Sequence, residues 1–156
     1  MAKLKKQHMT IHWKAIVQDD SSIPATEATL KEKATLVGRI GLMMLSVGTG
    51  AWRVRNSMNK VARCLGITCT ADIGLLAISY TCIEGTDTYT QSISNPTTGV
   101  NTHKLMQLEL FMKEFPDKVS TYSVKHIHEV LDEIQKLPAN YKAWNLGLAS
   151  AIACCA

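Results

Sequence analysis

Residues 37–65 read VGRIGLMMLSVGTGAWRVRNSMNKVARCL, and this stretch decides the fold. Apolar residues recur at intervals of three and four on both sides of Gly48-Thr49-Gly50, which is the spacing of one helix face. The first stripe is Val37, Ile40, Met44 and Val47, and the second is Ala51, Val54, Met58, Val61 and Leu65. A tight glycine turn between two helices predicts an antiparallel pair. Thr29 and Glu32 form a capping box for the first helix, and Gly66 suits a left-handed cap after the second.

The chain then changes from helical spacing to strand spacing. Residues 67–93 are rich in Thr, Ile, Tyr and Cys, which favour strands. Apolar and small polar residues alternate through 76–82, and residues 84–87, Glu-Gly-Thr-Asp, suit a hairpin turn into 88–93. With an earlier strand at 67–71, the pattern predicts a three-stranded meander.

Two further helices follow a loop at 95–99. Asn101 can cap the first, which carries the stripe Leu105, Leu108, Met112 and Phe115. We expect Pro116-Asp117 to break it. Ser123 can cap the second, which carries Val124, Ile127, Leu131 and Ile134 and is stopped by Pro138. The predicted fold class is α+β: two N-terminal helices, a three-stranded β-meander, two further helices, and then the start of a transmembrane helix.

That last element is predicted from residues 143–156, which contain no charged side chain and no helix-ending signal. A membrane span needs roughly 20 apolar residues, so we interpret 141–156 as the start of a truncated transmembrane helix. Lysines near the N-terminus and at 136 and 142 fit the basic flanks of cytoplasmic segments. We therefore expect a basic flexible tail at 1–25, a cytoplasmic α+β domain at 26–140, and the lipid bilayer as a partner.

Composition and motifs exclude several kinds of chemistry. The formal net charge is +4, much of it in N-terminal lysines that could attract anionic lipid, but a solvated tail is favoured and we expect no nucleic-acid partner. No nucleophile elbow, phosphate loop or dinucleotide fingerprint is present, so we expect no enzyme, no catalytic residue and no cofactor. His126 and His128 lie two apart and would point away from each other on a helix, so we expect solvated histidines and no metal site.

Three residues are candidates for binding a small substrate. Arg53 lies in the first turns of the second helix, off its apolar stripe, where a guanidinium could hold a carboxylate. The alternative is a surface arginine or one paired with an acid such as Glu32. Asn101 and His103 begin the third helix, where backbone N–H groups favour an anion, although an asparagine there can be only a helix cap.

The order of these pieces resembles the N-terminal domain of the threonine/serine exporter family, including the smaller subunit of paired bacterial succinate exporters. Four segments carry the resemblance, in order: residues 38–41 (Gly-Arg-Ile-Gly), 47–54 with Met58 and Leu65-Gly66, 99–105 (Gly-Val-Asn-Thr-His-Lys-Leu), and 141–144 (Tyr-Lys-Ala-Trp). Family members often place acids near the glycine turn, where this chain has Gly50 and Arg55.

The resemblance implies a cytoplasmic domain attached to a multi-helix membrane domain in the bacterial inner membrane. The expected function is export of small amino acids (threonine or serine) or dicarboxylates by a secondary transporter, with Arg53, Asn101 and His103 as the tentative substrate-binding residues. A second membrane subunit or a homo-oligomer is a possible partner. The alternative is a regulatory, metabolite-sensing or partner-docking module of a split exporter that does not itself form the transport path.

Overall fold

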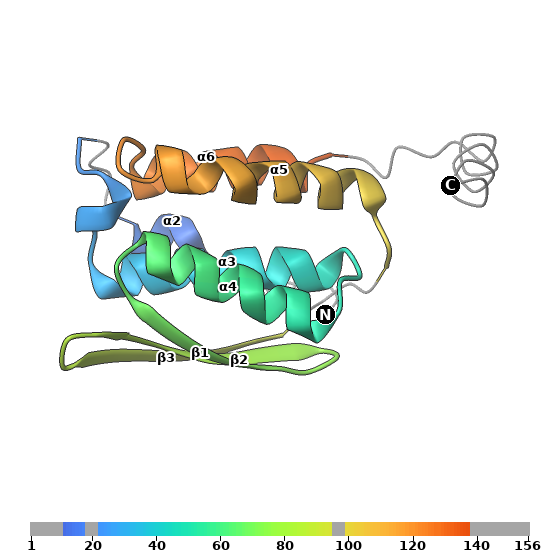
Figure 1. Cartoon of the computed structure of the whole chain (residues 1–156), viewed down its shortest axis with the longest axis horizontal. Coiled ribbons are helices and arrows are strands. Elements are labelled where there is room, and N and C mark those ends of the chain that lie inside the picture. Colours follow the sequence, from blue (N-terminus) through green and yellow to red (C-terminus); the bar gives the residue numbers. More distant parts are fainter. Residues whose placement is uncertain (1–10, 18–21, 95–98, 138–156) are drawn as a thin grey trace.

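The computed structural model describes residues 11–17, 22–94 and 99–137, and these form three stacked layers (Figure 1). An antiparallel sheet is one outer layer, the helices α3 and α4 are the middle layer, and α5 and α6 are the other outer layer. The predicted α+β order is confirmed. The elements are α2 (Trp13–Ile16), η1 (Ala25–Glu27), α3 (Leu30–Ser46), α4 (Ala51–Cys64), β1 (Thr68–Ile73), β2 (Ala77–Glu84), β3 (Asp87–Ser94), α5 (Thr102–Lys118) and α6 (Val124–Gln135).

Helix α3 is the centre of the fold. Its start is the predicted capping box: the Thr29 hydroxyl accepts a hydrogen bond from the Glu32 backbone N–H at 3.3 Å and donates one to the Glu32 carboxylate at 3.0 Å. The prediction of a single buried stripe on this helix is wrong, because every residue from 32 to 41 is buried. The reason is its position: the sheet packs on one side of α3, and α4 and α6 pack on the others.

Two glycines let neighbouring elements approach α3 closely. A Cβ atom on Gly38 would lie 2.2 Å from the hydroxyl oxygen of Tyr80, and one on Gly41 would lie 2.5 Å from the sulfur of Met58. Tyr80 belongs to the sheet, and its hydroxyl donates a hydrogen bond to the Ala34 carbonyl oxygen at 2.8 Å. The two glycines of segment 38–41 therefore set the spacing of α3 against β2 and against α4.

We expect Gly38→Ala to lower the free energy of unfolding by about 1–3 kcal/mol. The added methyl group collides with a fully packed tyrosine ring, and overpacking of this kind outweighs the helix propensity gained over glycine. Chemical denaturation of the purified full chain measures the change. Gly50→Ser is the matched control, since no atom lies within 4 Å of a Cβ at Gly50. Equal stability of the two variants would contradict the close packing described here.

The predicted glycine turn and meander are both present. Gly48 and Gly66 adopt positive φ angles of 91° and 75°, as expected for the turn between α3 and α4 and for the cap after α4. The sheet order is β1-β2-β3, with β1 running to Ile73, two residues further than predicted. Of the alternating apolar residues, Ile78, Tyr80 and Cys82 point into the core, whereas Leu76 precedes β2 and is 65% exposed. Hydroxyl pairs cover the outer face of the sheet: Ser79 with Ser92 at 2.6 Å and Thr81 with Thr90 at 2.9 Å.

The outer helices show one correction. Asn101 and Ser123 cap α5 and α6 as predicted, accepting from the backbone N–H groups of Lys104 and His126 at 3.1 Å each. Helix α5, however, continues through Pro116 to Lys118. A proline so near the helix end removes a single hydrogen bond, and the buried Phe115 and Val119 on either side hold the last turn against the core.

The two predicted terminal segments fall largely outside the described residues. Part of the stretch expected to be a free tail is packed: Trp13 is 8% exposed and Ala25 is fully buried. The tail was predicted from the lysines of 1–25, so the packing of Trp13 and Ala25 against the rest of the domain was missed. No helix in the described ranges is long and apolar enough to cross a bilayer. The predicted membrane entry at 141–156 lies beyond Leu137, the end of the last described range.

Candidate functional site

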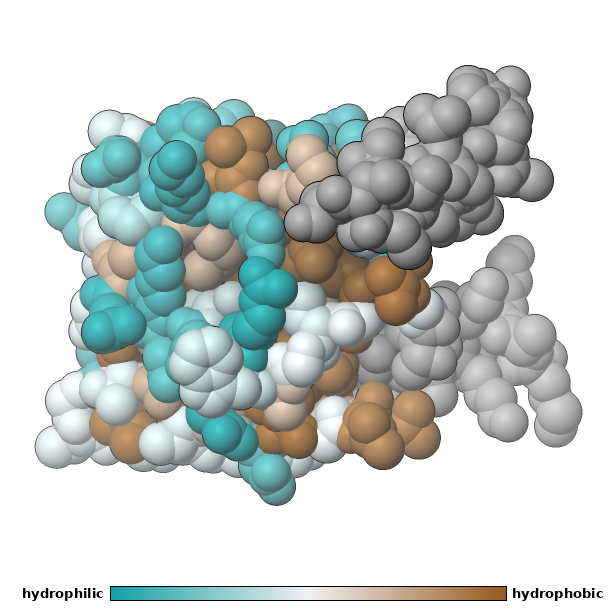
Figure 2. Space-filling model, turned by 45° about the vertical axis from the view of Figure 1, so that its right-hand side comes forward, coloured by the Kyte–Doolittle hydropathy of each residue, from teal (hydrophilic) through white to brown (hydrophobic). Residues whose placement is uncertain are grey.

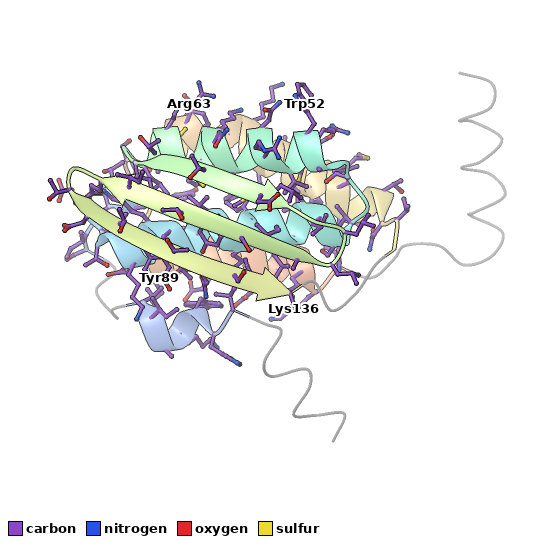
Figure 3. The ribbon with its side chains drawn as sticks, turned by 90° about the horizontal axis from the view of Figure 1, so that it is seen from below. Trp52, Arg63, Tyr89 and Lys136 are labelled. Atoms are coloured by element: carbon purple, nitrogen blue, oxygen red, sulfur yellow. The ribbon has the colours of Figure 1, made fainter. Side chains whose placement is uncertain are left out.

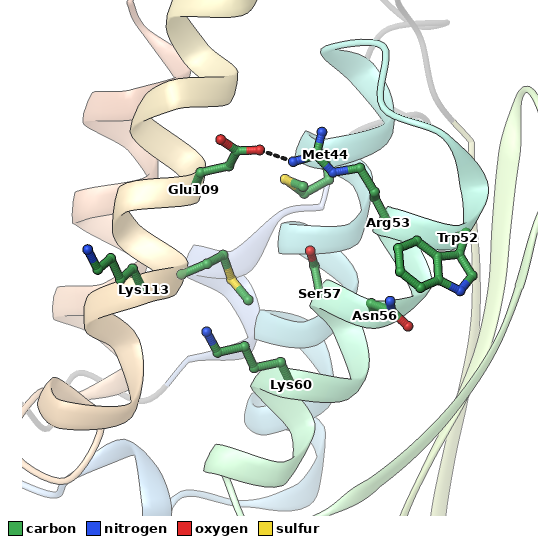
Figure 4. Close-up of a pocket in the computed structure, with 9 residues that line it drawn as sticks. Met44, Trp52, Arg53, Asn56, Ser57, Lys60, Glu109 and Lys113 are labelled. Carbon is green, nitrogen blue, oxygen red and sulfur yellow. Dashed lines mark hydrogen bonds and ion pairs between the residues drawn. The ribbon is translucent and has the colours of Figure 1, made fainter.

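An open groove runs between α4 and α5 and encloses about 390 Å³ (Figure 4). Its floor is apolar, formed by the side chains of Met44 and Met112, which are nearly fully buried. Its walls are polar and come mainly from α4. The lining residues are Met44, Trp52, Arg53, Asn56, Ser57, Lys60, Glu109, Met112 and Lys113.

The sequence of α4 explains why its polar residues face this groove. Arg53, Asn56, Ser57 and Lys60 are spaced by three and four, so they form a second stripe beside the buried one. Because Val54 and the other stripe residues lock α4 against α3, the polar stripe must point sideways toward α5. This stripe was visible in the sequence, but only Arg53 was singled out from it.

Arg53 forms an ion pair with Glu109 of α5 across the groove (Figure 4). This is the alternative that the sequence left open, a surface arginine paired with an acid, although the partner is Glu109 and not Glu32, which is engaged at the start of α3 with Thr29. Both members of the pair are about half exposed, so water screens their attraction and a ligand can compete for either group. Lys60 and Lys113 add positive charge, while Asn56 and Ser57 add neutral donors and acceptors.

The structure does not bring Asn101 and His103 into this groove. The Asn101 side chain is occupied as the cap of α5, and its backbone N–H donates to the Val47 carbonyl oxygen at 3.3 Å. His103 lies half-buried in the first turn of α5. Glu109 was missed, since no local signal marks which acid on α5 faces an arginine 56 positions earlier.

A second polar cluster, centred on the buried side chains of Arg39 and His128, belongs to the framework. Arg39, from the segment 38–41, donates through Nη1 to the His128 carbonyl oxygen at 3.0 Å and through Nη2 to Gln135 at 3.0 Å, and it pairs with Asp132. The Trp13 ring stacks on the His128 ring with centroids 4.7 Å apart, and its indole N–H donates to Asp132 at 3.2 Å. Arg39 thus ties α3 to α6, and Trp13 closes the cluster from the N-terminal side.

The prediction of two solvated histidines is wrong for His128, which is fully buried, while His126 is exposed beside Tyr122. Burial, together with the nearby positive charge of Arg39, lowers the pKa of His128 to about 3. The imidazole is therefore neutral at physiological pH, with Nδ1 at 3.1 Å from Arg39 Nη1. Partial burial raises the pKa of Asp132, but its hydrogen bond and charge interaction with Arg39 prevail and lower it.

The part of the chain that the structure describes contains no cluster of potential metal ligands. Within those ranges no three His, Cys, Asp or Glu side chains gather closely enough to hold an ion. The groove, by contrast, offers opposite charges and amide and hydroxyl groups above an apolar floor. Such a set suits reversible binding of a small polar molecule.

Comparison with known protein families shows which family the chain belongs to. Residues 35–156 match the family model of the threonine/serine exporter, ThrE, and the chain belongs to this family. The resemblance seen in the sequence is confirmed. By its name the family consists of exporters, which are transporters and not enzymes, and the name implies association with a membrane. Neither the search of curated proteins nor the search of solved structures gave a match.

Proposed function

We propose that this chain is the cytoplasmic N-terminal part of a bacterial inner-membrane secondary transporter that exports threonine, serine or a dicarboxylate. We further propose that the α4–α5 groove contacts the exported molecule. Family membership supports the exporter role. The observation that carries the groove assignment is the half-exposed Arg53–Glu109 pair above an apolar floor. The uncharged sequence of 143–156 supports attachment to the membrane.

The charges of the groove favour an amino acid over a dicarboxylate. An amino acid presents a carboxylate to the Arg53 guanidinium and an ammonium group to the Glu109 carboxylate. Asn56 and Ser57 can bond the hydroxyl group of threonine or serine. A dicarboxylate would find Arg53, Lys60 and Lys113, but it would also meet the negative charge of Glu109.

Two substitutions test the groove, and the second of them separates these substrates. We expect Arg53→Ala to lower the rate of threonine export by about 10-fold or more at limiting substrate, because a charge-assisted hydrogen bond contributes about 1.5–3 kcal/mol. Glu109→Gln is expected to lower threonine export similarly but to leave dicarboxylate export unchanged or faster. Efflux from preloaded cells measures both fluxes, with transporter abundance measured in parallel.

Arg63→Ala is the matched control. Arg63 is an exposed arginine at the opposite end of α4 from Trp52, well away from the groove (Figure 3). Normal flux in the Arg53 and Glu109 variants would remove the groove from the transport path. That outcome would favour the alternative of a regulatory or partner-docking module, for which the exported molecule need not touch this domain.

A further inference from the structure

The end of the domain that holds the turn between α3 and α4 carries five exposed apolar side chains, which we call the apolar end. They are Trp52 (71% exposed), Leu75 (89%), Leu76 (65%), Val100 (78%) and Met106 (65%). Single exposed apolar residues are normal on a protein surface, but a group drawn from separate segments marks an interaction site. We propose that the apolar end docks on the surface of a lipid bilayer.

Backbone contacts hold these segments at one end. The Asn101 N–H donates to the Val47 carbonyl oxygen at 3.3 Å, which fixes Val100 beside the turn at Gly48. Arg55 donates to the Ala71 carbonyl oxygen at 3.3 Å, which fixes the end of β1 beside the first turns of α4. The loop with Leu75 and Leu76 follows directly, so it lies on the same side as Trp52.

The figures agree with this placement. In Figure 3 Trp52 lies at the end of α4 that is on the same side of the molecule as the β1–β2 turn, while Arg63 lies at the far end of the same helix. Figure 2 turns the apolar end forward and shows several brown, apolar surface groups on that side of the molecule. The start of α5 and the end of α6 also lie at this end (Figure 1).

The position of the uncharged run in the chain identifies the occupant. This run begins at Ala143, six residues after Leu137, which follows α6 at the apolar end. Six residues span at most about 20 Å even when fully extended. If 143–156 enters a bilayer, Leu137 lies within that distance of the lipid, and the apolar end is the nearest surface of the domain.

The chemistry of the apolar end fits lipid. Tryptophan prefers the interface between headgroups and acyl chains, where its ring is apolar and its N–H remains hydrated. Leu75 and Leu76 project at a loop tip and can insert beside it. The same segments carry the basic residues Arg55 and Lys104 and one acidic residue besides the paired groups, Asp72. Arg53 adds no net charge, because Glu109 neutralises it.

This inference rests on the membrane attachment in the proposed function but not on the groove. Its test uses the full chain carrying Trp144→Phe, reconstituted in phosphatidylcholine–phosphatidylglycerol vesicles. Trp13 and Trp52 then remain, and a variant that also carries Trp52→Phe supplies the Trp13 background. We expect brominated acyl chains to reduce the emission of Trp52 by about two-fold and the membrane to protect it from aqueous iodide.

The matched control moves the reporter to the opposite end of the domain. It combines Trp144→Phe and Trp52→Phe with Thr86→Trp, in the exposed turn between β2 and β3. We expect iodide, and not bromine, to quench this reporter. A double variant Leu75→Asp, Leu76→Asp is expected to abolish bromine quenching of Trp52, whereas Ile83→Asp near the far turn is expected to preserve it.

Each other outcome contradicts the docking. Quenching of Trp52 by iodide alone would mean that the apolar end stays in water. Protection from both quenchers would mean that another protein surface covers it. Equal bromine quenching of Trp52 and of the Thr86→Trp reporter would mean that the apolar end is not the part of the domain that faces the membrane. A chain that does not float with vesicles would contradict the membrane attachment itself, whereas a chain that floats with Trp52 in water would contradict only the docking.

Discussion

Arg39→Ala is expected to lower the free energy of unfolding by about 3 kcal/mol, because it removes the buried guanidinium that joins α3 to α6 and leaves Asp132 without its ion-pair partner. The guanidinium donates to the His128 carbonyl oxygen and to Gln135, and it pairs with Asp132. Without Arg39 the buried His128 carbonyl oxygen and the partly buried Asp132 carboxylate lose their donor, and unsatisfied buried polar groups are costly. The contact between α3 and α6 would be the first to loosen.

Chemical denaturation of the full chain in mild detergent, followed by circular dichroism, measures this change. Arg63→Ala is the control, since its exposed side chain should alter stability by less than about 0.5 kcal/mol. The double variant Arg39→Met, Asp132→Leu is expected to recover part of the loss, because it removes both charges together. Equal stability of Arg39→Ala and the control would show that the cluster contributes nothing to folding.

Acidification is the second change expected to have a large effect. His128 has a pKa of about 3 in the folded domain, against an ordinary value of 6.5. Between these values the unfolded chain binds a proton that the folded chain does not, so stability falls as pH falls, by up to about 1.4 kcal/mol per pH unit. Asp132, whose pKa is lowered, adds a loss of the same sign below its ordinary value of 3.8.

Thermal unfolding between pH 7.5 and pH 4 measures this dependence, and His128→Phe is the control. The phenyl ring can retain the stacking on Trp13 but cannot take up a proton. We expect a shallower dependence on pH for this variant between pH 6.5 and pH 4, even though it is less stable at neutral pH. Identical slopes for the two proteins would mean that His128 does not titrate upon unfolding.

The features predicted most accurately from the sequence are those that depend on hydrogen bonds between residues close together in the chain. The three caps at Thr29, Asn101 and Ser123 are each formed within three residues, so the spacing of the side chains was sufficient. The hairpin turn at Gly85 is local in the same way. The helix through Pro116 was missed because packing of Phe115 and Val119, and not local propensity, decides where α5 ends.

The sequence could not reveal bonds between distant residues. Arg39 and His128 are 89 positions apart, and Arg53 and Glu109 are 56 apart. Helical spacing shows which face of a helix is apolar, but it does not show that a helix has partners on every side. For this reason Arg39 was noticed only through the Gly-Arg-Ile-Gly resemblance, and the groove only through Arg53.

The central position of α3 has a consequence for how the domain comes apart. The sheet contacts α3 on one side, and α4, α6 and Trp13 contact the rest of its surface. Neither outer layer can leave without opening the surroundings of this one helix, so partial unfolding of a single layer is penalised. We therefore expect the domain to unfold as one cooperative unit, because the loss of either outer layer would expose the buried surface of α3.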